Sequence, residues 1–105
     1  MTGMRLDKWL WFARFVKTRS LAAKLCGEGS VTIGGSVVLK PGHPVRVGDV
    51  LSVRQGSVLR RVSVLALGAR RGPPAEARLL YAETAPPLSL RAAEAAEWVR
   101  LLDEG

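Results

Sequence analysis

The sequence contains few of the residues that build catalytic and metal sites. It has one cysteine and one histidine in 105 residues, which excludes an intramolecular disulfide and a zinc site of about four such ligands. Cys26 lies among leucine and alanine residues, which indicates a buried thiol. His43 lies between Gly42 and Pro44, a sequence typical of a loop, and no partner for acid–base chemistry stands beside it. With no glycine-rich phosphate or dinucleotide motif either, we expect no enzyme activity, no cofactor and no metal.

Long apolar runs are also absent. No stretch approaches the ~20 residues that span a membrane, and the N-terminus lacks the apolar segment and cleavage site of a signal peptide. A single reduced cysteine fits a cytoplasmic location. The length suits one domain, and an apolar fraction of 48% predicts a folded chain. We expect a monomer without membrane contacts.

Acidic residues are scarce over most of the chain. Residues 1–75 hold 13 Lys or Arg against 3 acidic residues, whereas residues 76–105 hold 3 against 6. This asymmetry predicts a polyanionic partner for the basic part. The alternative is that the basic residues only keep the domain soluble.

The first half of the chain has the pattern of two helices followed by a hairpin. Apolar spacing predicts a helix over residues 5–14, with Trp9 in the core and either Trp11 or Phe12 at its rim. A second helix is predicted from the N-cap Thr18 to about residue 28, with leucines 21 and 25 on its apolar face. Two β-branched runs around Gly34 and its neighbour at 35 predict a β-hairpin over 31–38.

The second half predicts strands over residues 50–53 and 61–65, followed by a basic loop over 68–74. Residues 75–85 fit either a strand or a helical turn. Ser89 is a suitable cap for a last helix that extends to about residue 103. The predicted fold is therefore α+β: an N-terminal helical hairpin on a small, twisted, antiparallel sheet, with a C-terminal helix.

Basic side chains gather near the start of the chain. The first 24 residues hold six Lys or Arg against one Asp. Arg5 and Lys8 are three positions apart and would share one face of a helix. The start of the second helix, near Thr18, offers free backbone N–H groups and a positive dipole that suit a phosphate. We interpret this region as a phosphate-binding surface, with a solvated charged face as the alternative.

Several short motifs occur in a characteristic order. They are Arg5-Leu6-Asp7-Lys8, Thr18-Arg19-Ser20-Leu21-Ala22, Gly29-Ser30-Val31, Gly34-Gly35, Lys40-Pro41 and Val47-Gly48-Asp49. Together they resemble the S-four RNA-binding domain, or alpha-L module, over residues 4–54. Residues 55–105 would then complete the same single domain. The motifs Lys17-Thr18-Arg19-Ser20, Arg54-Gln55-Gly56 and Leu79-Leu80-Tyr81 are similar to those of small bacterial ribosome-associated heat-shock proteins.

The resemblance implies a protein that binds structured ribosomal RNA of the large subunit. It further implies a role in stress-related rescue of subunits that hold a nascent chain on transfer RNA. By position, the RNA-facing residues would be Arg5, Lys8, Lys17, Thr18, Arg19 and Lys40. The full set of predicted RNA-binding residues adds Arg14, Ser20, Lys24 and Arg54.

The chain departs from that family at two places. The hairpin turn is Gly34-Gly35, where the family often has Asn-Gly, and an acid-bearing helix stands where the family commonly has a longer basic extension. Two other functions stay open. The basic helical hairpin would also suit a DNA-binding helix-turn-helix module, or weak DNA binding, and the acidic last helix would suit a protein-interaction adaptor.

Overall fold

The computed structural model describes residues 3–89 and has the predicted α+β architecture. The helices are α1 (Leu6–Phe12), α2 (Arg19–Gly27) and α3 (Pro74–Ala77), and α3 continues into the 3-10 turn η1 (Arg78–Leu80). The strands are β1 (Met4–Arg5), β2 (Val31–Ile33), β3 (Ser36–Val37), β4 (Pro44–Val45), β5 (Val50–Gln55), β6 (Val58–Val64), β7 (Tyr81–Glu83) and β8 (Leu88–Ser89). Among these residues, none of the helices has the length and apolar character needed to cross a bilayer.

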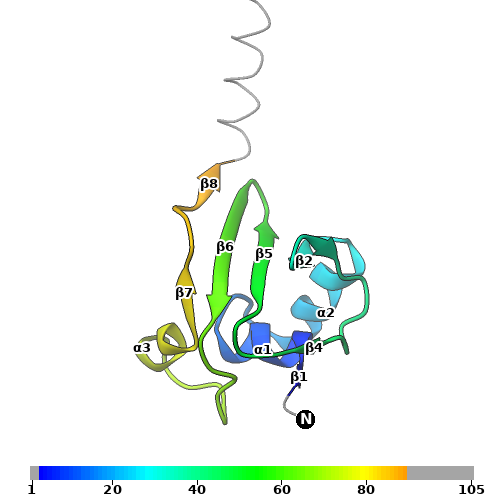
Figure 1. Cartoon of the computed structure of the whole chain (residues 1–105). Helices are drawn as coiled ribbons and strands as arrows, with labels where there is room; N and C mark the ends of the chain where they lie inside the picture. The colour runs from blue at the N-terminus through cyan, green and yellow to red at the C-terminus, as the bar shows by residue number, and fades with distance from the viewer. Residues whose placement is uncertain (1–2, 90–105) are drawn as a thin grey trace, which may run out of the picture.

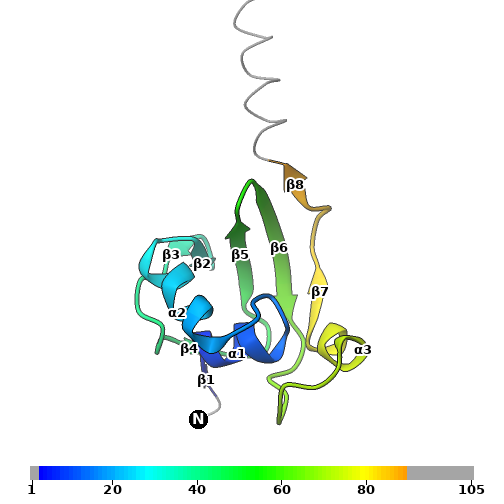
Figure 2. The same cartoon turned by 180° about the vertical axis from the view of Figure 1, so that it is seen from behind.

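The main sheet is antiparallel throughout its described strand pairs. Its order is β3-β2-β5-β6-β7, and β8 pairs with the other end of β6. A separate short pair, β1 with β4, ties the N-terminus to the middle of the chain. Figures 1 and 2 show the long β5–β6 hairpin at the centre, with α2 and β2 to one side and α3 and β7 to the other. The sheet thereby joins the two halves of the sequence.

The first helix is shorter than its apolar spacing predicts. Arg5 lies in β1, just before α1, so the expectation that Arg5 and Lys8 share a helical face is wrong. The C-terminal end is set by Arg14, which has a positive φ of 61°. The N–H of Arg14 donates to Trp11 and that of Phe15 to Leu10. This pair of bonds is the Schellman ending that usually contains glycine, and it turns the chain away toward α2.

The second helix begins and ends as expected. The Thr18 hydroxyl accepts a hydrogen bond from the backbone N–H of Leu21 at 3.2 Å. Gly29 ends the helix with a φ of 76°, the left-handed conformation that glycine adopts without steric cost. The buried face consists of Ala22 and Cys26. Leu21 is 44% exposed, so its predicted place on the apolar face is wrong, because α2 touches the core along a narrower stripe.

The predicted hairpin forms with a Gly34-Gly35 turn. Both glycines have positive φ, 59° and 86°, as a two-residue primed turn requires. The strands it joins are β2 and β3, with Ile33 opposite Ser36. The expectation from the Gly-Gly pair is therefore confirmed.

The core lies between the helices and one face of the sheet. Trp9 is fully buried, and its indole N–H donates to the Ala66 carbonyl at 3.0 Å, which confirms its predicted core position. Phe12 is 5% exposed while Trp11 is only partly buried, so Trp11 is the aromatic at the rim. Leu51, Val53, Val62 and Val64 face the same core.

Residues 75–85, for which the sequence allowed either a strand or a helical turn, contain both kinds of structure. Residues 74–80 form α3 and η1, and residues 81–83 form β7 against β6. Ser89 lies in β8 opposite Val58, and whether it also caps the predicted helix depends on residues outside the described range. The predicted C-terminal helix otherwise lies outside the described residues.

Candidate nucleic-acid interface

Asp7 holds two arginines at the point where α1 and α2 begin. Its side chain is 6% exposed and accepts from Arg5 Nε at 3.1 Å, from Arg5 Nη2 at 3.2 Å and from Arg19 Nε at 3.4 Å. The backbone N–H of Lys8 donates to the same carboxylate at 2.8 Å. We call Arg5, Asp7 and Arg19 the Asp7 cluster. Its two guanidinium groups exceed its one carboxylate, so the cluster stays positively charged.

The charges in this cluster stabilise one another. Burial on its own would raise the pKa of Asp7, but the Arg5 hydrogen bond, the Arg19 charge and the Lys8 N–H outweigh burial and hold that pKa below its usual value. The Asp7 carboxylate in turn raises the pKa of Arg5. The arginine side chains are 55% and 44% exposed. Asp7 therefore fixes two guanidinium groups that still face solvent.

The loop between β3 and β4 packs beside this cluster. The carbonyl of Pro41 accepts from the N–H of Asp7 at 3.1 Å, and the carbonyl of His43 accepts from the N–H of Leu6 at 2.9 Å. A Cβ on Gly42 would lie 3.3 Å from Nη1 of Arg5, so glycine leaves room for the guanidinium. Lys40 is exposed at the start of this loop and directly precedes Pro41, which contacts the backbone of Asp7.

The N-terminal end of α2 adjoins the cluster through Arg19. Thr18 satisfies the N–H of Leu21, whereas the N–H groups of the first helical residues have no partner within a helix. Thr18 and Ser20 are exposed, and each hydroxyl is a donor as well as an acceptor. Backbone N–H groups, hydroxyls and two guanidinium groups thus meet at one place.

The other predicted RNA-binding residues are spread more widely. Lys8 lies over the Phe12 ring at 5.5 Å, and Lys24 pairs with Glu28 at 4.0 Å along α2. Arg54 follows the buried Val53 in β5. Because side chains alternate along a strand, Arg54 points to the sheet face away from the core and the helices. The structure does not bring Arg54 to the Asp7 cluster.

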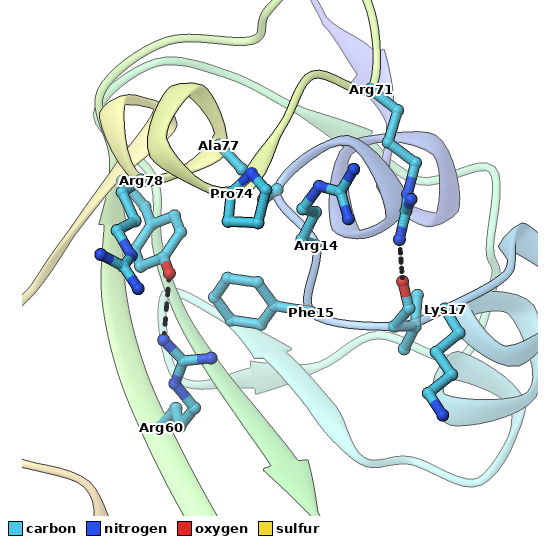
Figure 3. Close-up of a pocket in the computed structure, with 11 residues that line it drawn as sticks. Arg14, Phe15, Lys17, Arg60, Arg71, Pro74, Ala77 and Arg78 are labelled. Atoms are coloured by element: carbon cyan, nitrogen blue, oxygen red, sulfur yellow. Dashed lines mark hydrogen bonds between the residues drawn. The ribbon is translucent and has the colours of Figure 1, made fainter.

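A second group of basic side chains surrounds a cavity of about 580 Å³. We call this cavity the basic pocket; it lies between the α1–α2 connection, β6 and α3, and Figure 3 shows its basic side chains around Phe15. Its lining residues are Ala13, Arg14, Phe15, Val16, Lys17, Arg60, Arg71, Pro74, Ala77, Arg78 and Tyr81. Two predicted site residues, Arg14 and Lys17, are therefore directed here.

Backbone carbonyls hold two of these arginines in place. Arg14 Nε donates to Gly72 at 2.6 Å, and Arg71 donates to Trp11 from Nε at 3.1 Å and to Val16 from Nη2 at 3.3 Å. Because a backbone carbonyl carries no net charge, these hydrogen bonds do not neutralise the positive charge of either guanidinium group. The Arg71 guanidinium also lies 5.5 Å from the Trp11 ring.

Arg60 forms the wall of the pocket on β6. Its guanidinium lies 4.5 Å from the centre of the Phe15 ring and donates to the Tyr81 hydroxyl at 3.2 Å and to Glu83 at 2.6 Å. Burial opposes the charge on Arg60, but the hydrogen bonds to Glu83 and Tyr81 outweigh it and raise the pKa of Arg60. Arg60 is thus the one pocket cation with a carboxylate partner among residues 3–89.

Sequence reasoning did not find this pocket. Arg60, Arg71 and Arg78 come from β6, a loop and η1, and no local spacing connects them with Arg14. The paired arginines at 70 and 71 marked the loop as basic, but only the tertiary fold shows that Arg71 lines the pocket while Arg70 pairs with Glu76. Among the described residues, no group of three or more histidine, cysteine or acidic side chains is placed to hold a metal ion.

Comparisons with known proteins agree with this architecture. The model of the S4 domain matches residues 4–51, which include the Asp7 cluster and the β3–β4 loop. The solved trimeric structure of Vibrio cholerae Heat Shock Protein 15 superposes with a TM-score of 0.75 and 38% identity, over 95% of this chain and 98% of that one. The chain belongs to the heat shock protein 15 family.

Two further relatives show how the family members differ in extent. Heat shock protein 15 of Escherichia coli strain K12 is 48% identical over 82 residues, covering 78% of this chain and 61% of the relative. The chain thus spans under two thirds of that relative's length. The RQC P-site tRNA stabilizing factor of Halalkalibacterium halodurans is 43% identical over 61 residues, 58% of this chain and 68% of the factor.

Proposed function

We propose that this protein binds structured ribosomal RNA, without catalysis, through the Asp7 cluster, the N-terminal end of α2 and Lys40. The observation that carries the proposal is the Asp7 cluster itself. A buried carboxylate holds two half-exposed guanidinium groups next to free N–H groups of a helix start. Guanidinium groups present forked donors that match phosphate oxygens, so the surface is built to receive a sugar–phosphate backbone.

Fixed orientation favours binding beyond what charge alone supplies. An arginine that is already positioned loses less side-chain freedom when it binds. The neighbouring helix start and Lys40 add further groups that can bind phosphates. If about four to six phosphates are contacted, the slope of log affinity against log salt is about −3 to −4.

The RNA we propose is that of the large ribosomal subunit carrying a nascent chain on transfer RNA, in a cytoplasmic rescue role. Family membership and the relative called a P-site tRNA stabilizing factor support this choice. A binding role without chemistry fits the two reactive residue types: His43 is exposed in a loop, and burial raises the pKa of the Cys26 thiol to about 11.

The test uses two variants that each lower the net charge by one. Arg5→Gln/Asp7→Asn/Arg19→Gln removes both guanidinium groups without leaving a buried carboxylate unpaired. Arg54→Gln makes the same net change on the far face of the sheet. Filter binding of a structured large-subunit RNA fragment should show at least tenfold weaker binding for the triple variant and a salt slope smaller by about 1.5. Arg54→Gln should bind within about threefold of wild type.

Equal weakening by the two variants, with both folded by circular dichroism, would mean that only net charge matters and would remove the site assignment. The second measurement repeats the filter binding with a duplex DNA of the same length at the same salt concentration. Tighter binding to DNA than to the RNA fragment would replace the proposal with a DNA-binding function.

We also propose that one chain is the binding unit. Leu6, Trp9 and Leu10 are fully buried within a single chain, so the core needs no second copy. Light scattering at micromolar concentration should return the mass of one chain. A mass of three chains would match the solved relative, which is described as trimeric, and would contradict the monomer.

A further inference from the structure

We propose that the basic pocket binds one unpaired nucleotide of the RNA, with its phosphate among the guanidinium groups and its base against the apolar floor. This inference rests on the proposed RNA binding but concerns a separate place. Three of the five cations, Arg60, Arg71 and Arg78, lie outside the residues that the S4 domain model matches. The volume of about 580 Å³ falls within the range of about 300–1,000 Å³ that is usual for small-molecule sites.

The pocket concentrates positive charge that the protein does not neutralise. Five cations line it, and within residues 3–89 only Arg60 among them forms an ion pair with a carboxylate. Backbone carbonyls position Arg14 and Arg71. These carbonyls do not neutralise the two guanidinium groups, whose remaining N–H groups can donate to a ligand. Like charges held this close repel one another, and an anion relieves that repulsion.

The floor of the pocket is apolar and partly aromatic. Phe15 contacts Tyr81 edge-on, with ring centres 4.9 Å apart, and Pro74 and Ala77 complete the surface. The guanidinium carbon of Arg60 lies 4.5 Å from the centre of the Phe15 ring. A planar base has a face for stacking on aromatic rings and on guanidinium planes, and this floor offers both.

A nucleotide fits the pocket better than an acidic peptide does. A carboxylate side chain would satisfy the cations but would leave the apolar floor without a partner. The chain also connects the pocket to the Asp7 cluster directly, because Lys17 lines the pocket and Arg19 belongs to the cluster. The pocket and the cluster thus use residues only two positions apart in the α1–α2 connection, which favours one RNA that contacts both.

The experiment titrates the full chain with pentauridylate, an unstructured five-nucleotide RNA, and follows the Nε–Hε signals of Arg14 and Arg71 by NMR. Both signals should shift. Arg78 is exposed in η1, so Arg78→Glu should fold normally, and it should weaken pentauridylate binding about tenfold. Arg46→Glu, with the same charge change in the β4–β5 turn outside the pocket, should weaken binding less than threefold. Inorganic phosphate and triglutamate should both bind at least tenfold more weakly than pentauridylate.

Each other result overturns the assignment. Equal effects of the two variants would mean unspecific attraction, and phosphate binding as tightly as pentauridylate would mean an anion site that ignores the base. Triglutamate binding as tightly, with the same dependence on Arg78, would mean a peptide site. If wild-type protein bound the ribosomal RNA fragment but not pentauridylate, the pocket assignment would be wrong and the proposed function would stand.

The Asp7-cluster triple variant separates the two sites. It should bind the ribosomal RNA fragment at least tenfold more weakly and still show the Arg14 and Arg71 shifts when pentauridylate is added.

Discussion

Replacing Asp7 by asparagine should destabilise the protein even though it makes a basic protein more basic. The Asp7 side chain is 6% exposed, and its carboxylate accepts four hydrogen bonds, three of them from the guanidinium groups of Arg5 and Arg19. Asparagine keeps one acceptor oxygen, and its amide donors would face guanidinium donors. The charge and part of the hydrogen bonding are lost together.

The size of the effect follows from burial of the carboxylate and exposure of its partners. Hydrogen bonds to charged groups contribute about 1.5–3 kcal/mol each, but solvent around half-exposed arginines screens much of this. We expect the Asp7→Asn change to lower the free energy of unfolding by about 1–2 kcal/mol. Each kcal/mol corresponds to a fall in Tm of about 4–8 °C for a domain of this size.

The pH dependence separates this explanation from a packing defect. The folded pKa of Asp7 lies below its usual 3.8, so the stability it contributes is present above about pH 4 and is lost as pH falls through the folded pKa. Urea unfolding followed by circular dichroism should show the gap between wild type and Asp7→Asn at pH 7, and the gap should close toward pH 2. Glu28→Gln, which alters the exposed Lys24 pair, should cost under about 0.5 kcal/mol. Equal stability at pH 7, or a gap unchanged at pH 2, would refute the role given to Asp7.

Three further changes test other parts of the structure. Thr18→Ala removes the α2 cap and should lower stability by about 0.5–2 kcal/mol, measured by urea unfolding against Thr32→Ala in β2 as a site without a capping role. Trp9→Phe leaves a cavity and an unpaired Ala66 carbonyl and should cost about 2–4 kcal/mol; a smaller loss than for Trp11→Phe would contradict the core assignment. Cys26, whose pKa burial raises to about 11, should resist a thiol reagent at pH 8 until urea unfolds the chain, and rapid labelling of the native protein would be the opposite result.

Local sequence chemistry accounts for most of the fold. Thr18, Gly29 and the Gly34-Gly35 turn each act through their own backbone or side chain, so one stretch of sequence is enough to predict them. Arg14 ends α1 in a left-handed conformation that propensities assign to glycine or asparagine. A hydrogen bond to Gly72, far along the chain, helps to hold it there. That partner cannot be read from local sequence, and the helix was therefore predicted two residues too long at its C-terminal end.

The candidate site was predictable in composition but not in arrangement. The first 24 residues gave the right cations for the Asp7 cluster. Arg5 was expected to share a helical face with Lys8, yet it binds Asp7 together with Arg19, because β1 places Arg5 before the helix rather than on it. The basic pocket depends on contacts between distant segments, which spacing does not reveal.

The most direct test of the account is co-sedimentation of the full chain with isolated ribosomal subunits. We expect wild type and Arg54→Gln to pellet with large subunits that carry a nascent chain on transfer RNA, and more weakly with empty large subunits or small subunits. The Arg5→Gln/Asp7→Asn/Arg19→Gln variant should stay in the supernatant at the same salt. Equal pelleting of the triple variant and wild type, or equal pelleting of wild type with both subunits, would contradict binding of large-subunit RNA through the Asp7 cluster.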